Sequence, residues 1–457
     1  MAKEPEIRRH NSQFETKPES ALLIAVDAHG STWEITDSLE ELARLVESVD
    51  AQVVGAVTQR LNSPVAATYV GSGKVEEIKA LKESLEYDMV VANDELSPAQ
   101  LRNLERLLDT KVIDRTAIIL DVFARRAQTH EGRLQVELAQ LEYRLPRLTR
   151  MWTHLSRQAV GGVGVRGPGE TQLESDRREA QKRISFIKDQ LNEVHRHREL
   201  HRGHRRQSET PIVALVGYTN AGKSTLLNSL SGADVYAEDQ LFATLDPTTR
   251  RIELNDGRTA LLTDTVGFIN KLPTFLIAAF RATLEEIHEA SVLVHVLDVT
   301  HPNAREHMAT VAEVLEELGA DDKPVVVALN KVDRAGLGGV PTFDELMERL
   351  EIDGPSVGIS AQQGTGFEAL RDAIATAIDE ERGVRAVQVR IPYDRSEMVE
   401  RFYRAASVDA VDHDETGTLL TGRIAARDLE PYREFLIHEE PAVLTAAAAT
   451  GTRESAA

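Results

Sequence analysis

The 457-residue sequence contains no cysteine. This absence rules out disulfides, thiolate zinc sites and cysteine nucleophiles, and it agrees with a reducing compartment. The chain also lacks any apolar run of about 18 residues, the length that a membrane helix needs. Its first ten residues are charged rather than apolar. We therefore expect neither a membrane span nor a secretory signal, and we expect a cytoplasmic protein.

The chain is acidic, with a formal net charge of −21. An evenly acidic surface would repel nucleic-acid phosphates. The segment from Phe123 to Arg206, however, has 18 Lys and Arg against 10 Asp and Glu, a net +8 that leaves −29 for the rest. One basic segment is therefore set within an acidic protein.

Alternating apolar runs and helical stretches predict parallel α/β units. The first unit has apolar runs at 21–26, 53–57 and 88–92, and helical stretches near 38–48, 74–86 and 98–108. The second runs from Ile212 to about Glu381, with strands expected at 212–216, 259–263, 292–298, 325–330 and 356–359. A third, small unit has expected strands at 387–391 and 419–424 around a helix from Ser396 to Ala405.

The basic segment has the apolar spacing of two long helices. The residues that recur at intervals of three and four are Leu134, Leu138, Leu141, Leu145 and Leu148, and then Ile184, Ile187, Leu191 and Val194. Between them, the glycines and proline of 161–169 cannot continue a helix, so we expect a hairpin with a flexible tip. Gly203 and the polar residues 207–211 indicate a linker after it.

A phosphate-binding loop is predicted where Gly217, Gly222, Lys223 and Ser224 form Gly-x-x-x-x-Gly-Lys-Ser after an apolar strand. Its backbone N–H groups would hold phosphates, with Lys223 at the β- and γ-phosphates and Ser224 on Mg²⁺. This pattern occurs by chance in roughly one or two per cent of chains of this length. The expected contact residues are Gly217, Tyr218, Thr219, Asn220, Ala221, Gly222, Lys223, Ser224 and Thr225.

Three later segments would complete a guanine-nucleotide site. Asp264 can hold Mg²⁺ through water, and the Gly267 N–H can contact the γ-phosphate. Asp333 offers a carboxylate for two bonds to guanine that adenine cannot make, and a backbone N–H near Ser360 would meet the guanine oxygen. The residues concerned are Asp264, Thr265, Val266, Gly267, Asn330, Lys331, Val332, Asp333, Ser360 and Ala361.

A switch that senses the γ-phosphate is expected between the loop and the second strand of this unit. Its predicted contact residues are Phe242, Ala243, Thr244, Leu245 and Asp246. Thr244, Thr248 and Thr249 compete to complete the magnesium shell, and we favour Thr244; a plain β-turn at Asp246-Pro247 is the alternative. The expected metal ligands are thus Ser224, Thr244 and Asp264, and the expected catalytic residues are Lys223, Thr244 and Gly267.

These motifs together resemble the HflX family of ribosome-associated GTPases. The resemblance covers roughly residues 21–430. It is carried by 217–224, 242–248, 264–268 and 330–333, and outside the nucleotide site by 135–141, 161–174 and 176–178. It implies magnesium on Ser224 and Thr244 and binding to the large ribosomal subunit, with the glycine-rich tip near the peptidyl-transferase region. It also implies a role in ribosome splitting, rescue or assembly.

The expected fold is therefore α/β: a P-loop GTPase domain, an N-terminal parallel α/β domain, a long helical hairpin and a small C-terminal α/β domain. The expected boundaries are a disordered tail at 1–20, the N-terminal domain at 21–127, the hairpin at 128–206, the GTPase domain at 211–382, the C-terminal domain at 384–438 and a tail at 444–457. Nothing indicates an obligate dimer, and we expect a monomer.

Two residues bear on the expected mechanism. Phe268 stands where Ras-like GTPases have a water-orienting glutamine, so we expect slow intrinsic hydrolysis that ribosomes stimulate; ordinary packing is compatible with this. Asn220 resembles the asparagine that ligates K⁺ in potassium-activated GTPases, although hydrogen bonding within the loop is a simpler role.

Alternatives stay open at this point. Ribosomal RNA contact through the basic hairpin is one hypothesis; a solvated coiled-coil spacer, or an arm that docks a protein partner of a molecular switch, is another. An ATPase would leave Asp333 facing a base without a matching donor pair. Gly71-Ser-Gly-Lys74 is similar to a second phosphate loop, but Val75 and Thr68 depart from the pattern, and a strand-to-helix turn is the simpler account.

Overall fold

The computed structural model describes residues 18–28, 33–148, 168–206, 210–232, 241–273, 275–276, 286–337, 342–352 and 354–441. Its described residues form two compact units: 1–125 with 140–180, and 126–139 with 181–457. The expected hairpin tip, including Gly161 and Arg166, lies outside the described residues.

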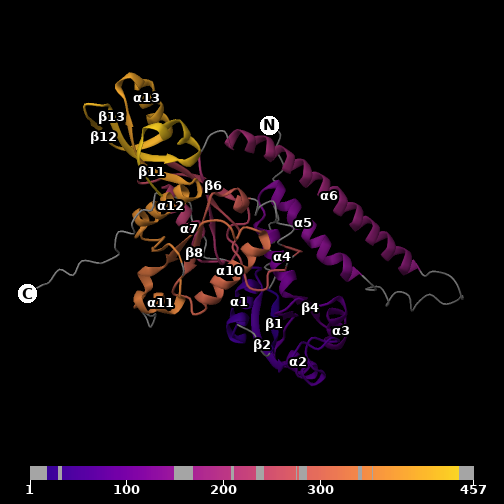
Figure 1. Cartoon of the computed structure of the whole chain (residues 1–457). Helices are drawn as coiled ribbons and strands as arrows, with labels where there is room; N and C mark the ends of the chain where they lie inside the picture. The colour runs from indigo at the N-terminus through magenta and orange to yellow at the C-terminus, as the bar shows by residue number, and fades with distance from the viewer. Residues whose placement is uncertain are drawn as a thin grey trace, which may run out of the picture. The chain divides into compact units, whose positions relative to one another are not determined.

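A four-stranded parallel sheet forms the N-terminal part of the first unit (Figure 1). Its order is β2-β1-β3-β4, and the strands alternate with helices along the chain. The elements are β1 (Ser20–Ala28), α1 (Ile35–Glu47), β2 (Gln52–Leu61), α2 (Ser72–Leu85), β3 (Met89–Ala92), α3 (Pro98–Leu108), β4 (Lys111–Asp114) and α4 (Arg115–Arg126). Apolar residues of α2 and α3 share a buried cluster with one face of the sheet. The expected parallel α/β fold is confirmed, and β4 is a strand that the apolar pattern did not reveal.

Two helices follow, α5 (His130–Arg144) and α6 (Pro168–Arg206). The spacing had extended the first helix to Leu148, but residues Leu145–Leu148 form a 3₁₀ turn because Pro146 cannot continue an α-helix. The second helix begins at Pro168, where the missing N–H costs nothing, and it continues through Gly203 to Arg206. The expectation that Gly203 belongs to the linker was therefore wrong.

A six-stranded sheet of order β10-β9-β8-β5-β7-β6 follows, with only β6 antiparallel to its neighbour among the described strands. Helices α7 and α12 pack on one face and α10 and α11 on the other. The elements are β5 (Ile212–Val216), α7 (Lys223–Ser231), β6 (Thr248–Glu253), β7 (Thr259–Asp264), β8 (Val292–Asp298), α10 (Ala304–Leu318), β9 (Val325–Asn330), α11 (Phe343–Leu350), β10 (Ser356–Gly358) and α12 (Phe367–Glu381). The carboxyl ends of its parallel strands meet at one edge, where ligands of such sheets bind.

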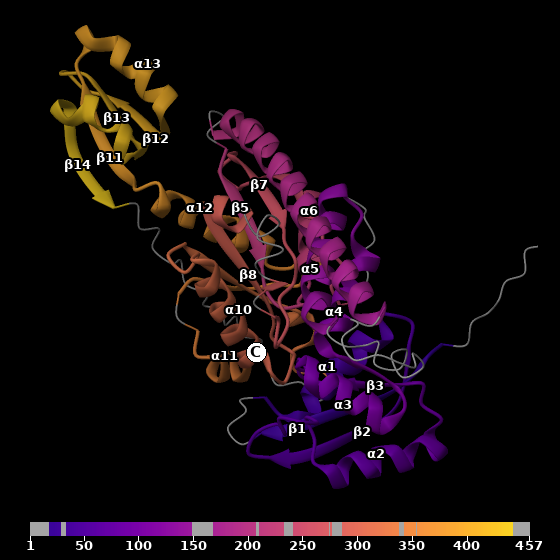
Figure 2. The same cartoon turned by 90° about the vertical axis from the view of Figure 1, so that its right-hand side faces the viewer.

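The C-terminal part is an antiparallel sheet of order β12-β13-β11-β14 with α13 on one face (Figure 2). Its elements are β11 (Val384–Ile391), α13 (Ser396–Ala405), β12 (Ala406–His413), β13 (Thr418–Ala425) and β14 (Leu436–Pro441). The expected helix is found at the expected residues, and two further strands complete the sheet. No helix in the described part of the chain is long and apolar enough to cross a membrane.

Candidate nucleotide-binding site

The loop from Gly217 to Gly222 joins the end of β5 to the start of α7. Gly217 has φ 148°, and a Cβ there would lie 2.3 Å from the Val296 carbonyl oxygen. Gly222 has φ 100°, and a Cβ there would lie 2.2 Å from the Asn330 side-chain nitrogen. Only glycine fits either position, which explains two of the four residues that define the sequence motif. The loop therefore presents backbone N–H groups at a helix N-terminus, as anion binding requires.

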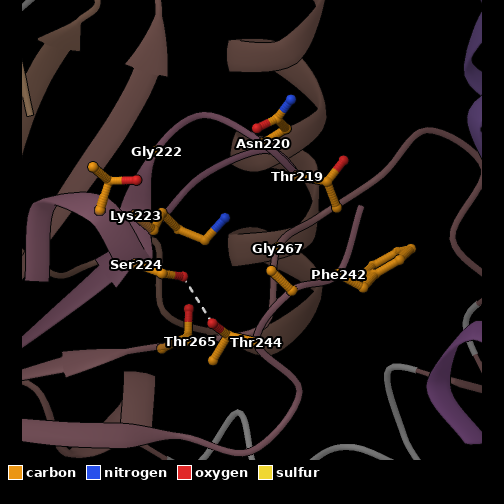
Figure 3. Close-up of a pocket in the computed structure, with 11 residues that line it drawn as sticks. Thr219, Asn220, Gly222, Lys223, Ser224, Phe242, Thr244, Thr265 and Gly267 are labelled. Carbon is orange, nitrogen blue, oxygen red and sulfur yellow. Dashed lines mark hydrogen bonds between the residues drawn. The ribbon is translucent and has the colours of Figure 1, made fainter. Parts of the chain in front are cut away.

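Lys223 is buried within this loop (Figure 3). Its ammonium group donates to the carbonyl oxygens of Gly217 at 3.0 Å and Tyr218 at 2.8 Å. Burial lowers the pKa of Lys223 to about 8, although the Asp264 carboxylate acts in the opposite direction. The loop thus holds a cation beside the backbone N–H groups that are predicted to bind phosphate.

Three oxygen ligands converge from three separate segments of the chain. The Ser224 Oγ lies 2.7 Å from the Thr244 Oγ1 (Figure 3). It also donates to Asp264 Oδ2 at 2.7 Å. Burial raises the pKa of Asp264, although Lys223 and the two hydroxyls oppose this shift. The other carboxylate oxygen, Oδ1, is buried and has no hydrogen-bond partner. One carboxylate and two hydroxyls, with an unpaired buried oxygen, fit Mg²⁺ that also binds substrate phosphates and water.

The other two threonines of the switch are placed differently. The Thr249 hydroxyl lies 2.9 Å from the Thr263 hydroxyl, across the β6–β7 pair. Thr248 is exposed at the first position of β6, paired in register with Asp264. Thr244 is therefore the threonine whose hydroxyl meets Ser224, and the geometry favours it over its two competitors.

The segment after β7 is fastened to the phosphate loop through its backbone. Thr219 N–H donates to the Phe268 carbonyl at 2.8 Å, and Phe268 N–H donates to the Gly217 carbonyl at 3.1 Å. A Cβ on Gly267 would lie 2.9 Å from both the Lys223 Nζ and the Thr219 Cα. The Phe268 side chain is buried. An apolar ring thus occupies this position, and it has no group that could orient water.

The side chain of Tyr218 adds a contact that no motif revealed. Its hydroxyl accepts the Asn270 N–H at 2.6 Å, and its ring stacks on His307 with 3.7 Å between ring centroids. The motif treats this loop position as variable, so only the fold could show it. Tyr218 therefore joins the phosphate loop to the segment that follows Gly267.

The predicted base-recognition residues meet at the ends of β9 and β10. Asn330 donates to the Ala221 carbonyl at 2.7 Å and accepts the Ala361 N–H at 2.9 Å. Asn330 thus joins the phosphate loop to the Ser360-Ala361 segment. Asp333 lies in the turn that follows, Val332–Arg334, and is partly exposed.

Lys331 makes a further connection at this end of the site. Its Nζ donates to the Asn220 carbonyl at 3.1 Å and pairs with Asp298 Oδ2 at 2.7 Å. Burial alone would raise the pKa of Asp298, but Lys331 and the Thr300 hydroxyl and N–H hold it below its ordinary value. Asp298 ends the buried strand β8, so its position at the same sheet edge was the signal that could have identified it.

Near residues 71–74 the structure agrees with a turn rather than a second phosphate loop. Gly71 is the N-terminal flank of α2, and its N–H donates to the Gln59 side-chain oxygen at 2.8 Å. Lys74 pairs with Glu77 at 2.8 Å. The Gly71 N–H and the Lys74 ammonium are therefore both engaged within the protein.

Comparison with known proteins identifies three matching family models. Residues 36–124 match "GTP-binding GTPase N-terminal", residues 126–205 match "GTP-binding GTPase Middle Region" and residues 212–331 match "50S ribosome-binding GTPase". Among solved structures, a GTP-binding protein of Sulfolobus solfataricus in complex with GDP is 27% identical, with a TM-score of 0.40 and coverage of 79% of this chain and 99% of that one.

Curated relatives match over nearly the whole chain. The GTPase HflX of Caldanaerobacter subterraneus is 44% identical over 419 residues, which is 92% of this chain and 94% of the relative. The GTPase HflX of Escherichia coli K12 is 44% identical over 384 residues, 84% of this chain and 88% of the relative. At this identity and coverage, the chain belongs to the HflX family of GTPases.

Proposed function

We propose that this GTPase binds Mg²⁺·GTP at the edge formed by β5, β7 and β9, and hydrolyses it when bound to the large ribosomal subunit in the cytoplasm. Lys223 and the loop N–H groups hold the phosphates, and Ser224, Thr244 and Asp264 provide oxygens around Mg²⁺, which supplies charge neutralisation at the β- and γ-phosphates. Asp333 selects guanine, with Ser360 and Ala361 at the opposite edge of the base. Ribosome splitting, rescue or assembly is the physiological task. A K⁺ ligand role for Asn220 stays a prediction.

The basic helix α6 supports the ribosomal partner. Arg177, Arg178, Lys182 and Lys188 are exposed along it, and Arg183 lies over the half-exposed Phe186 ring at 5.4 Å from its centroid. Cations on a long helix with an exposed aromatic ring are typical of surfaces that contact RNA phosphates and unstacked bases. The family model matched by 212–331 is itself described as ribosome-binding. A molecular switch that docks a protein partner is the competing function, and it requires no phosphate contact.

Asp333→Asn should exchange guanine for xanthine specificity. The carboxylate accepts two guanine donors, whereas an amide presents one acceptor and one donor, which matches the carbonyl of xanthine. Losing charge-assisted bonds should weaken GTP binding by roughly a hundredfold, and XTP binding should improve. Equilibrium binding of both nucleotides measures this, with the exposed Asp344→Asn on α11 as the control. Unchanged preference for GTP would remove Asp333 from the base site.

Gly267→Ala should slow hydrolysis more than it weakens GDP binding. The added methyl would lie 2.9 Å from the Lys223 Nζ and Thr219 Cα, so the Gly267 N–H or the ammonium must move. Because that N–H contacts only the γ-phosphate in the proposed site, single-turnover hydrolysis should fall by at least about tenfold. Gly73→Ala, where a Cβ has open space, is the matched control. Equal losses of GDP and GTP binding would instead mean a damaged loop.

Large ribosomal subunits should stimulate GTP hydrolysis strongly. With Phe268 buried and no side chain there to orient water, slow turnover by the free protein is expected. An arginine finger supplied by a partner raises rates by roughly 10³ to 10⁵, which sets the scale of stimulation available. Phosphate release is measured with and without subunits. Equal turnover in both conditions contradicts the coupling.

Removing positive charges from α6, which with α5 forms the helical arm, should reduce both the affinity for large subunits and the salt dependence of that affinity. Each lost phosphate contact lowers the slope of log affinity against log salt by about one, so Arg177→Gln with Lys182→Gln should lower it by up to about two. Arg305→Gln with Arg349→Gln, two exposed cations on α10 and α11, is the matched control. Co-sedimentation at rising salt is the measurement. Binding that salt does not weaken favours a protein partner instead.

A further inference from the structure

Asp246 of the switch segment contacts the start of helix α5, and both lie in the second unit. Its Oδ2 accepts the N–H groups of Gln128 and Thr129, each at 2.9 Å. Its Oδ1 accepts the Thr129 hydroxyl, which in turn accepts the Gly132 N–H at 2.9 Å. One carboxylate therefore binds the two residues that precede α5, including Thr129, which caps the helix and lies 117 residues earlier in the chain.

This contact follows from what a helix N-terminus needs. The first N–H groups of a helix have no partner within it, and an oxygen from a flanking side chain usually satisfies one of them. Thr129 does so for Gly132, and Asp246 then binds the Thr129 hydroxyl together with two further N–H groups. Negative charge at this end is also favoured by the helix dipole.

Gly132 gives independent evidence that the two segments are fitted to each other. Glycine is less favourable than alanine inside a helix. A Cβ on Gly132, however, would lie 2.5 Å from Asp246 Oδ1 and 3.1 Å from the Thr129 Oγ1. The glycine therefore makes room for the carboxylate, against the local preference of the helix.

Asp246 is also close in sequence to the switch threonine. It lies two residues after Thr244, whose hydroxyl is 2.7 Å from Ser224. The intervening Leu245 is buried, and so is Phe242 before it. A short, anchored stretch of backbone thus joins the magnesium cluster to the α5 cap.

We infer that Asp246 is a positioning residue for GTP hydrolysis: by capping α5 it holds Thr244 at the magnesium position and couples the nucleotide state to the helical arm. This inference rests on the proposed role of Thr244 at Mg²⁺ but not on the ribosomal partner. Coupling is reciprocal, so a nucleotide that fixes Thr244 must also stabilise the first turn of α5.

The first experiment measures the affinities of full-length protein for a non-hydrolysable GTP analogue and for GDP, with Mg²⁺ and with EDTA. Asp246→Ala, Thr129→Val and Gly132→Ala should each reduce the preference for the GTP analogue in Mg²⁺ by roughly tenfold, toward the lower end of the usual range for coupled sites. GDP affinity should change little, and the difference should vanish in EDTA. Thr129→Ser, which keeps the hydroxyl, should behave as wild type.

Matched controls separate coupling from damage to the helix. Gly73→Ala adds the same methyl to a helix with open space around it, and Glu345→Ala removes the capping-box carboxylate of α11. Both should leave the preference unchanged. Asp246→Ala combined with Thr129→Val should lose no more than Asp246→Ala alone, because the Thr129 hydroxyl reaches the switch segment only through the Asp246 carboxylate.

Hydrogen exchange of the amides of residues 131–134 measures the reverse direction. In the wild type, the GTP analogue should protect them more than GDP does, and Asp246→Ala should abolish that difference. Equal protection by both nucleotides, or Gly132→Ala with wild-type preference, overturns the inference. Thr244→Ala separates failure of the magnesium role from failure of the coupling. If Thr244→Ala leaves the preference for the GTP analogue unchanged, the proposed role of Thr244 at Mg²⁺ fails. If Thr244→Ala reduces this preference but Asp246→Ala does not, only the coupling fails.

Discussion

The Ser224 hydroxyl, placed between Asp264 and Thr244, is the contact on which the nucleotide site depends. Asp264 ends β7, Ser224 opens α7, and Thr244 belongs to the segment before β6. A parallel sheet brings the first two together, since β5 and β7 are neighbours and their carboxyl ends share an edge. The third must come to them from an irregular segment. In the proposed magnesium site, the sheet therefore fixes Ser224 and Asp264, and an irregular segment supplies Thr244, as expected of a switch that senses the nucleotide.

Around this cluster the chain uses side chains and glycines to fix the loops. Asn330 fastens the phosphate loop to Ala361, and Lys331 fastens it to Asp298. Gly217 and Gly222 permit the close approaches of Val296 and Asn330. These contacts join the ends of different strands, so the predicted base and phosphate ends of the site are connected along one sheet edge.

Sequence patterns predicted those elements whose structure depends mainly on residues close together in the chain. The phosphate loop, strands β5 and β7, and helix α13 could be predicted from spacing and composition alone. Contacts between segments far apart in sequence could not: nothing near Tyr218 indicates that its hydroxyl reaches Asn270, and nothing near Asp246 indicates Thr129. Strands β6, β12 and β14 were missed because their exposed faces break the apolar pattern. Among the three switch threonines, only the fold shows that Thr249 is engaged by Thr263.

Contacts of unequal strength hold the switch segment, residues 242–246, and the strand pair that follows it. Beyond Asp246, strand β6 pairs with β7, and the turn between them is tied down by Arg258, which pairs with Asp379 on α12. Asp379 is buried and also pairs with Arg423 of β13 at 3.3 Å.

Leaving the buried Asp379 carboxylate without its arginine partners is strongly unfavourable, whereas losing a helix cap costs only about 0.5–2 kcal/mol. The pairs that Asp379 forms with Arg258 and Arg423 should therefore persist through the nucleotide cycle. In the proposed coupling, the Asp246 contact with the start of α5 is the weaker of the two, so we expect a movement of Thr244 to pass to the helical arm rather than to the C-terminal sheet.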